Sequence, residues 1–234
     1  MQKVLVITGA SKGIGHATAK HFQQQGYRVV NISRSPSPLD NISQIYADLS
    51  DINWLAQHQD ELLLATAGAD QLAVIHCAAA HENDRIENLS ATRLQSILQA
   101  NLIAPVQLTQ LLLPMMKPGS SVLYLGSTLS EKAVANACSY VTSKHAVIGL
   151  MRSTCQDLVG KNIHTACICP GFTDTEMLRQ HVGDSVEIMQ GIAQAVSFNR
   201  LIQPEEIANT LFFCATNPVI NGSVIHANLG QIES

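Results

Sequence analysis

The first fifteen residues limit the fold more than any other stretch of the chain. Val4 to Ile7 is an apolar run rich in branched side chains, which predicts a strand buried on both faces. A glycine-rich turn follows directly, and residues 16–25 have the pattern of a helix. Such a turn alone could be an ordinary loop. Its place between a strand and a helix favours a nucleotide site, because the backbone can approach a phosphate there and the helix N-terminus favours its charge. The residues expected to hold the phosphates are Gly9, Ser11, Lys12, Gly13, Ile14 and Gly15.

Strand and helix patterns then alternate to the end of the chain. Strands are expected at 4–7, 28–33, 45–47, 72–76, 121–125, 163–169 and 223–227. Helices are expected at 16–25, 54–66, 89–116, 138–159 and from 204 onward, with a partly helical stretch at 174–203. This alternation predicts an α/β fold, a doubly wound parallel sheet of seven strands with helices on both faces. Ligands of such sheets bind beyond the carboxyl ends of the strands, so the turns after the strands should line one crevice.

Length and charge argue against several other classes of protein. The 234 residues fit a single domain, 1–234, and a net charge of −4 gives no broad basic surface for nucleic acid. The chain begins almost inside its first strand and has no apolar run near the length of a membrane span, so we expect a cytoplasmic protein. The six cysteines form no CxxC pair, and we expect neither a disulfide nor a metal site.

Three polar residues in the second half of the chain form a pattern with chemical meaning. Ser127 follows a strand, Tyr140 comes thirteen residues later, and Lys144 lies four residues beyond on the same helix face. An ammonium about 4 Å from a phenol, at an effective dielectric of about 20, favours the phenolate by about 4 kcal/mol. Such a pair moves a phenol toward use as an acid and base at neutral pH. A YxxxK pair alone is a weak signal, and the serine and the glycine-rich turn strengthen it.

With these motifs the chain resembles the short-chain dehydrogenase/reductase family in its single-domain branch, and in particular the 3-oxoacyl-acyl-carrier-protein reductases. The resemblance covers nearly the whole chain: Thr8 to Gly15, Asn101, Ser127, Tyr140, Lys144, Pro170, Gly171, Thr173, Thr175, and Pro204 to Ala208. It implies a Rossmann-type fold, a nicotinamide cofactor and the reversible reduction of a carbonyl. In the family's pattern Tyr140 would be the general acid/base, Lys144 would hold the nicotinamide ribose, and Ser127 would hold the carbonyl oxygen.

Asn101 lies on an apolar helix face, where its side chain needs a polar partner. Pro105 stands four residues later and has no N–H, so the helical hydrogen bond to the Asn101 carbonyl cannot form. We hypothesise that this carbonyl binds a water that leads to Lys144, which is the proton-relay role that the family assigns to this asparagine. A simple proline kink is the alternative.

The end of the second strand bears on the choice between NAD and NADP. Relatives that prefer NAD carry an acid where Ser33 stands, and it holds the ribose 2′-hydroxyl. Here that acid is missing, and Arg34 and Lys12 can meet a 2′-phosphate, so NADP(H) is expected and NAD less so. Arg34 could instead be a solvated turn residue. Asp48, followed by Leu49, resembles the adenine-contacting position of the family, and a helix-cap role is compatible with it.

Two segments depart from the family's pattern. The usual Asn-Asn-Ala-Gly appears as His76-Cys77-Ala78-Ala79, with an alanine where glycine is usual, and Cys77, Ala78 and Ala79 are still expected at the cofactor. The C-terminal Asp-Gly-Gly is replaced by Asn228-Leu229-Gly230. Both changes bear on cofactor binding and on subunit contacts. We interpret His76 as a core or ribose-side residue rather than a catalyst.

These patterns favour an NADP(H)-dependent carbonyl reductase or alcohol dehydrogenase that acts on a small molecule. Family resemblance implies a homotetramer or homodimer. A non-catalytic NADP(H)-sensing protein of the same fold is the alternative, whereas a nucleotide-sugar epimerase would need a substrate domain for which the chain has no length. A substrate lid is expected at about 174–203, with Phe172, Met177 and Leu178 as apolar contributors, although a plain core is a second interpretation of that stretch.

Overall fold

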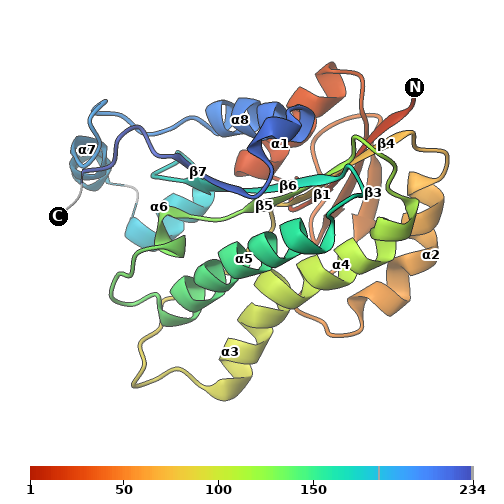
Figure 1. Cartoon of the computed structure of the whole chain (residues 1–234). Coiled ribbons are helices and arrows are strands. Elements are labelled where there is room, and N and C mark those ends of the chain that lie inside the picture. Colours follow the sequence, from red (N-terminus) through yellow and green to blue (C-terminus); the bar gives the residue numbers. More distant parts are fainter. Residues whose placement is uncertain (184, 233–234) are drawn as a thin grey trace.

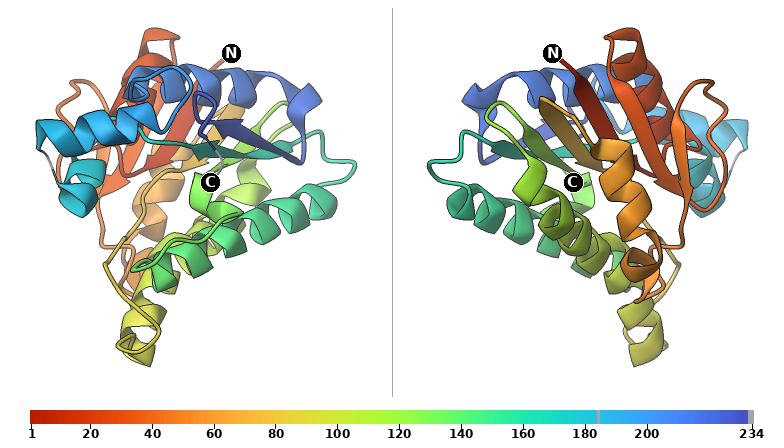
Figure 2. Two further views of the ribbon diagram at one scale, coloured as in Figure 1. Left: turned by 90° about the vertical axis from the view of Figure 1, so that its left-hand side faces the viewer. Right: turned by 90° about the vertical axis from the view of Figure 1, so that its right-hand side faces the viewer.

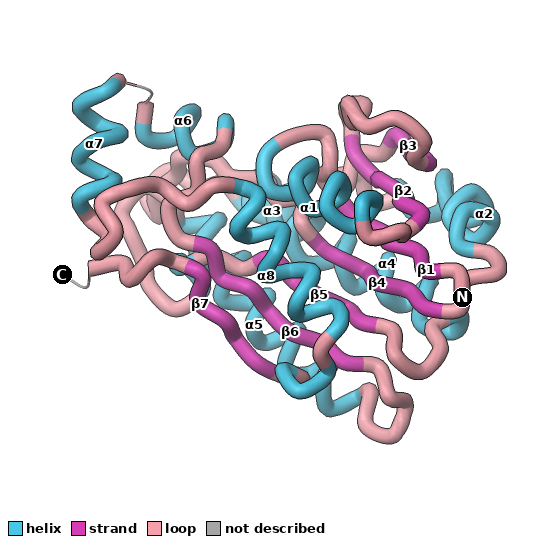
Figure 3. The backbone as a smooth tube through the Cα atoms, turned by 90° about the horizontal axis from the view of Figure 1, so that it is seen from above, coloured by secondary structure: helices cyan, strands magenta, loops and turns pink. Residues whose placement is uncertain are grey.

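Seven parallel strands form one sheet in the computed structural model of the chain, which describes residues 1–183 and 185–232 (Figure 1). The strands are β1 (Lys3–Thr8), β2 (Arg28–Ser33), β3 (Ser43–Tyr46), β4 (Gln71–His76), β5 (Ser121–Leu125), β6 (His164–Pro170) and β7 (Ser223–Ala227). Their order in the sheet is β3-β2-β1-β4-β5-β6-β7 (Figure 3). The chain runs outward from β1 to β3 and returns on the other side of β1 with β4. The order therefore reverses between β1 and β4, which confirms the doubly wound, Rossmann-type architecture.

Helices cover both faces of the sheet (Figure 2). They are α1 (Gly13–Gln24), α2 (Trp54–Thr66), α3 (Ala91–Leu98), α4 (Ala104–Leu112), α5 (Cys138–Asp157), α6 (Glu176–Val182), α7 (Val186–Gln194) and α8 (Pro204–Thr216). Alternate side chains of β1 face opposite cores: Val4 and Val6 pack in one core with α2, α4 and α5, while Leu5 and Ile7 pack in the other with α1 and α8. A strand buried on both faces needs apolar residues at every position, which is why the run at 4–7 is unbroken.

The long helix expected at 89–116 is divided into four parts. A π-helical turn at Gln99–Ile103 separates α3 from α4, and a 3₁₀ turn at Leu113–Met115 follows. Pro105 gives the physical reason, because its missing N–H interrupts the regular ladder at Asn101 and one wider turn absorbs the break. By length and composition the stretch Ala91–Met115 could cross a membrane, but Leu108 and Leu112 are fully buried against the sheet, so it is a core helix.

Other boundaries differ from the expected ones by a few residues. Helix α1 begins at Gly13 rather than at residue 16. Residues 174–203 contain α6 and α7, and these helices lie at the end of the sheet away from the N-terminus (Figure 1). Asp184, within the expected lid, lies outside the described residues. Two short 3₁₀ turns, Thr128–Ser130 and Pro218–Ile220, complete the elements.

Candidate functional site

The turns after β1 and β4 meet at the point where the strand order reverses. The Thr8 hydroxyl oxygen accepts hydrogen bonds from the backbone N–H groups of Cys77 and Ala78, both at 3.0 Å. Gly9 has a φ of +78°, and a Cβ atom on it would lie 2.9 Å from the Ala78 Cα. A side chain at this position would therefore separate the two turns. The close approach explains why the chain needs glycine here.

A cleft of about 1030 Å³ opens beyond the carboxyl ends of the strands. It brings together every residue that the sequence predicts for the cofactor, and three of the four predicted catalytic residues. These are Gly9, Ser11, Lys12, Gly13, Ile14, Gly15, Arg34, Asp48, Leu49, Cys77, Ala78, Ala79, Ser127, Tyr140, Lys144, Pro170, Gly171, Thr173 and Thr175. Asn101 is the predicted residue that does not line the cleft, because it is buried behind Ala80.

The glycine-rich turn forms one wall of the cleft and touches the expected lid. Gly13 has a φ of +55°, and a Cβ on it would lie 3.3 Å from the Thr175 methyl group. The Lys12 ammonium forms an ion pair with Glu176, the first residue of α6, at 2.9 Å. Lys12 is therefore already engaged by the lid in this structure, a partner that the sequence did not reveal.

Tyr140 and Lys144 lie on one face of α5, as their spacing predicted. The Lys144 side chain is buried, its ammonium lies 5.5 Å from the centroid of the Tyr140 ring, and it donates a hydrogen bond to the Leu125 carbonyl at 2.6 Å. The bond to the end of β5 fixes the ammonium beside the tyrosine. It also ties α5 to the strand that precedes Ser127.

Ser127 is held by a reciprocal turn with Ser130. The Ser127 N–H donates to the Ser130 hydroxyl, and the Ser127 hydroxyl oxygen accepts from the Leu129 N–H, each at 3.1 Å. In this hydrogen bond from the Leu129 N–H the Ser127 hydroxyl oxygen is the acceptor, so the O–H group remains available to donate into the cleft. A donor of this kind suits a carbonyl oxygen that gains negative charge.

The side chain of Asn101 finds the polar partners that its apolar face required. Its amide oxygen accepts from the Ala80 N–H at 2.6 Å, and its amide nitrogen donates to the Ala80 carbonyl at 2.8 Å and to Ser143 at 2.9 Å. Asn101 thereby fixes the turn after β4 against α5. The role of its main-chain carbonyl in a proton relay stays a prediction.

The segment 76–79, which departs from the family's pattern, begins with two residues that burial keeps uncharged. His76 is buried, lies 5.0 Å from the Tyr124 ring between centroids, and shares a hydrogen bond of 2.9 Å with Thr109. Burial lowers the pKa of His76 to about 3 and raises the pKa of the Cys77 thiol to about 12. Both residues are therefore neutral at physiological pH. The contacts of His76 favour the core interpretation.

The end of β2 forms the part of the cleft where a cofactor's adenosine would lie. Ser33 is buried and donates to the Ser35 carbonyl at 2.6 Å, whereas Arg34 is exposed to the cleft. Partial burial works against ionisation of Asp48, but hydrogen bonds from Ser50 and the Arg34 charge outweigh it and lower the pKa of this carboxyl group. Asp48 closes a turn with Ser50, and Asn53 is the residue at the start of α2, so the helix-cap interpretation of Asp48 was wrong.

Sequence reasoning missed two histidines that meet above the tyrosine. His81 lies in the segment after β4, with its ring edge-on to the Tyr140 ring and 4.2 Å between centroids. His181, on α6, approaches His81 from the lid side with 3.5 Å between ring centroids. The position of His81 shortly after a predicted strand was a usable signal. The sequence holds no comparable signal for His181, because the path of the expected lid over the cleft depends on the tertiary structure.

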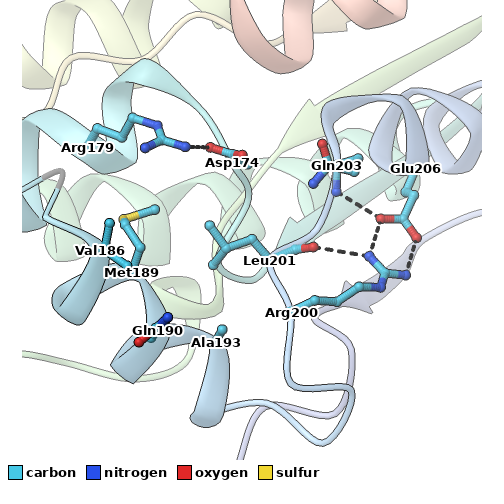
Figure 4. A pocket seen from close by; sticks show the side chains of 10 residues that line it. All are labelled: Asp174, Arg179, Val186, Met189, Gln190, Ala193, Arg200, Leu201, Gln203 and Glu206. Carbon is cyan, nitrogen blue, oxygen red and sulfur yellow. Dashed lines mark hydrogen bonds and ion pairs between the residues drawn. The ribbon is translucent and has the colours of Figure 1, made fainter.

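A second, shallower pocket of about 680 Å³ lies on the lid segment and is lined by other residues (Figure 4). At the start of the lid the Arg179 guanidinium pairs with Asp174 at 2.5 Å. At its end Arg200 forms two hydrogen bonds of 2.7 Å with Glu206, and these bonds with the Gln203 N–H lower the pKa of Glu206 to about 2. The first pair lies within the expected lid segment, and the second joins the end of that segment to α8.

A doubly wound sheet with a glycine-rich turn and a Ser–Tyr–Lys set in one cleft defines a dinucleotide-dependent dehydrogenase or reductase. The sequence profile described as "Enoyl-(Acyl carrier protein) reductase" matches residues 9–231. The chain belongs to the short-chain dehydrogenase/reductase family. It is an oxidoreductase of carbonyl or alcohol groups.

Three similar proteins illustrate this membership. Protein FixR of Bradyrhizobium diazoefficiens is 30% identical over 98% of this chain and 86% of its own length. Carbonyl reductase family member 4 of Xenopus tropicalis is 26% identical over 96% of each chain. The solved structure of 4-hydroxyisoleucine dehydrogenase complexed with NADH has a TM-score of 0.88 and 24% identity, and the match covers 98% of each chain. The last of these supports the fold.

Proposed function

We propose that the protein is an NADP(H)-dependent oxidoreductase that reduces a carbonyl to a secondary alcohol, or performs the reverse reaction, with Tyr140 as the general acid/base. The observation that carries the proposal is that Ser127, Tyr140 and Lys144 line the same cleft as the glycine-rich turn. The experiment that tests it is NADPH consumption across a panel of ketones, 3-oxoacyl thioesters and steroids. Consumption that depends on one class of ketone would support the proposal, and a protein that binds NADPH but reduces nothing would contradict it.

The cleft fits a dinucleotide. Its volume is about 1030 Å³, and the backbone of Gly9, Gly13 and Gly15 lines it without side chains. The first turn of α1 offers backbone N–H groups to a pyrophosphate there. Residues from β2 and the segment that follows β3 would hold the adenosine end, and Thr173 and Thr175, which also line the cleft, would contact the cofactor. The bound nicotinamide would supply or accept the hydride.

The protein's own groups would handle the oxygen and the proton. The Ser127 O–H would donate to the substrate oxygen, because its own oxygen already accepts from Leu129. The Tyr140 hydroxyl would deliver a proton to that oxygen as negative charge develops on it. The Lys144 ammonium, fixed by the Leu125 carbonyl, would stabilise negative charge on the tyrosine oxygen and hold the ribose.

The proposal keeps a positioning role and a relay role for Asn101. Its side chain fixes the turn at Ala80, and the π-helical turn shows that the helix is irregular around it. The missing N–H of Pro105 supports the hypothesis that the Asn101 carbonyl binds a water on the path to Lys144.

We expect Arg34→Ala to weaken NADPH binding about tenfold or more and to change NADH binding little. A charge-assisted contact with the 2′-phosphate is worth about 1.5–3 kcal/mol, and NADH lacks that phosphate. Fluorescence titration of both cofactors on one preparation measures the two effects. Arg34→Lys is the matched control, because it keeps the charge and should retain most of the preference. Equal losses for both cofactors would assign Arg34 to folding and contradict its role in cofactor choice.

We expect the lid from about 176 to 198 to exchange its amide hydrogens faster than any other described helix or strand. Neither α6 nor α7 contains a fully buried residue, so few apolar contacts oppose their opening. Hydrogen exchange followed by mass spectrometry should show fast exchange in the free protein, and slower exchange with NADPH and a substrate analogue bound. Protection equal to that of β1 and β4 in the free protein would contradict a mobile lid.

A further inference from the structure

We infer that His81 and His181 form a recognition site for a carboxylate carried by the substrate close to its reactive carbonyl. The inference rests on the proposed role of Tyr140, because it takes the tyrosine hydroxyl as the place of reaction. It assigns the substrate to a chemical class, the oxo acids and their hydroxy acid counterparts. No role in the proposed hydride transfer uses either imidazole.

The position of the pair is the first observation. His81 contacts the Tyr140 ring at 4.2 Å between centroids, so a group bound at His81 lies beside the tyrosine. His181 reaches the same point from α6, across the cleft, at 3.5 Å between centroids. Both side chains line the cleft. A ligand at this point would touch the segment after β4 and the lid together.

The second observation is an unused hydrogen-bonding atom. Within the described residues, the Nδ1 atom of His81 is buried and has no hydrogen-bond partner. Buried polar atoms in folded proteins are nearly always bonded, and a bound ligand is one explanation for an exception that lies beside a cleft. A carboxylate suits the two rings because it offers two oxygens, each of which can accept one imidazole N–H.

The charges around the pair give the third observation. His81 faces His181 on α6 and Lys144 on α5, while Asp84 in its own segment is the opposing acid. Burial together with the charges of His181 and Lys144 lowers the pKa of His81 to about 4, and Asp84 acts against them. Burial also lowers the pKa of His181. The empty pair is therefore neutral at pH 7, beside a buried ammonium. An anion at this place would meet a positive potential and would favour a proton on the pair.

Binding of an anion at His81 and His181 should depend on pH. An anion should raise the pKa of His81 from about 4. At pH values between the pKa of the free protein and the higher pKa of the complex, His81 is then protonated more often in the complex. The anion should then bind more tightly as the pH falls from 8 to 5. A rise of about 1.5 pKa units corresponds to about fourfold tighter binding at pH 5 than at pH 8.

The experiment compares acetoacetate with 4-hydroxybutan-2-one, which has the same ketone and no charge. Both are titrated into the complex with NADP⁺, in which the ketone cannot be reduced, and the histidine side chains are followed by NMR. Acetoacetate should raise the pKa of His81 by at least one unit and bind at least tenfold more tightly than the neutral ketone at pH 6. His181→Gln should remove most of that preference, and His58→Gln, a substitution on α2 outside the cleft, should keep it.

The result that would overturn the inference is equal binding of the two ketones with unmoved histidine pKa values. The binding measurement needs no turnover, so it separates this inference from the proposed function. If neutral ketones are reduced through Tyr140 but the acid is not preferred, the inference fails and the proposed function stands. If the acid shifts the histidines but no ketone is ever reduced, the carboxylate site stands and the proposed function fails.

Discussion

Tyr140→Phe should lower turnover by about 10²–10⁴-fold, which is the usual loss when general acid catalysis is removed. Phenylalanine keeps the ring that contacts His81 and lies under the Lys144 ammonium, so the packing of the site is preserved. Without the hydroxyl, the negative charge that hydride transfer builds on the substrate oxygen has Ser127 to stabilise it but no proton from the tyrosine. NADPH affinity should change by no more than a few-fold, because in the proposed function the glycine-rich turn and Lys144 would hold the cofactor.

Turnover and NADPH binding should be measured on the same preparation of each variant. Tyr46→Phe provides a matched control, since Tyr46 is an exposed tyrosine on β3, and removing its hydroxyl should leave both quantities unchanged. Activity that survives Tyr140→Phe would exclude the tyrosine as the acid. Parallel losses of activity and NADPH affinity would indicate a disturbed cofactor site rather than lost proton transfer.

Gly15→Ala should reduce NADPH affinity at least about a hundredfold, a loss of about 2.7 kcal/mol. A Cβ atom at this position would overlap the carbonyl group of Gly9 and contact the Ala10 Cα. All of these are backbone atoms, so no side chain can rotate to make room and the turn itself must shift. Overpacking of this kind also costs about 1–3 kcal/mol of the free energy of unfolding. Fluorescence titration and denaturant unfolding measure the two effects.

Gly149→Ala is the control for that substitution. Gly149 lies on α5, where an added Cβ meets no atom within 4 Å. An exposed helical alanine is favoured over glycine by about 0.5–1 kcal/mol, so this variant should be at least as stable as the wild type and should bind NADPH normally. If Gly15→Ala matched it in both measurements, the tight contact between Gly15 and Gly9 would have no functional consequence.

The parallel sheet with helices on both faces could be predicted because it depends on the local pattern of apolar and polar residues. Each buried strand appears as an apolar run, and the turns after β1, β4, β5 and β6 must share one edge in a parallel sheet. The same rule predicts from the sequence that Gly9, Ser127 and Pro170 line one cleft, and they do. Helical periodicity likewise placed Tyr140 and Lys144 on one face of α5.

The sequence by itself thus determined the strand–turn–helix at the N-terminus, the parallel sheet and the pairing within α5, since each depends on residues a few positions apart. Only the tertiary structure decided which partners those groups meet across the cleft. Lys12 meets Glu176, Asn101 bonds to Ala80, and His81 meets His181. These pairs are separated by 164, 21 and 100 positions, as their residue numbers show. No local pattern encodes such distances, because they depend on how the lid and the segment after β4 pack over the completed sheet.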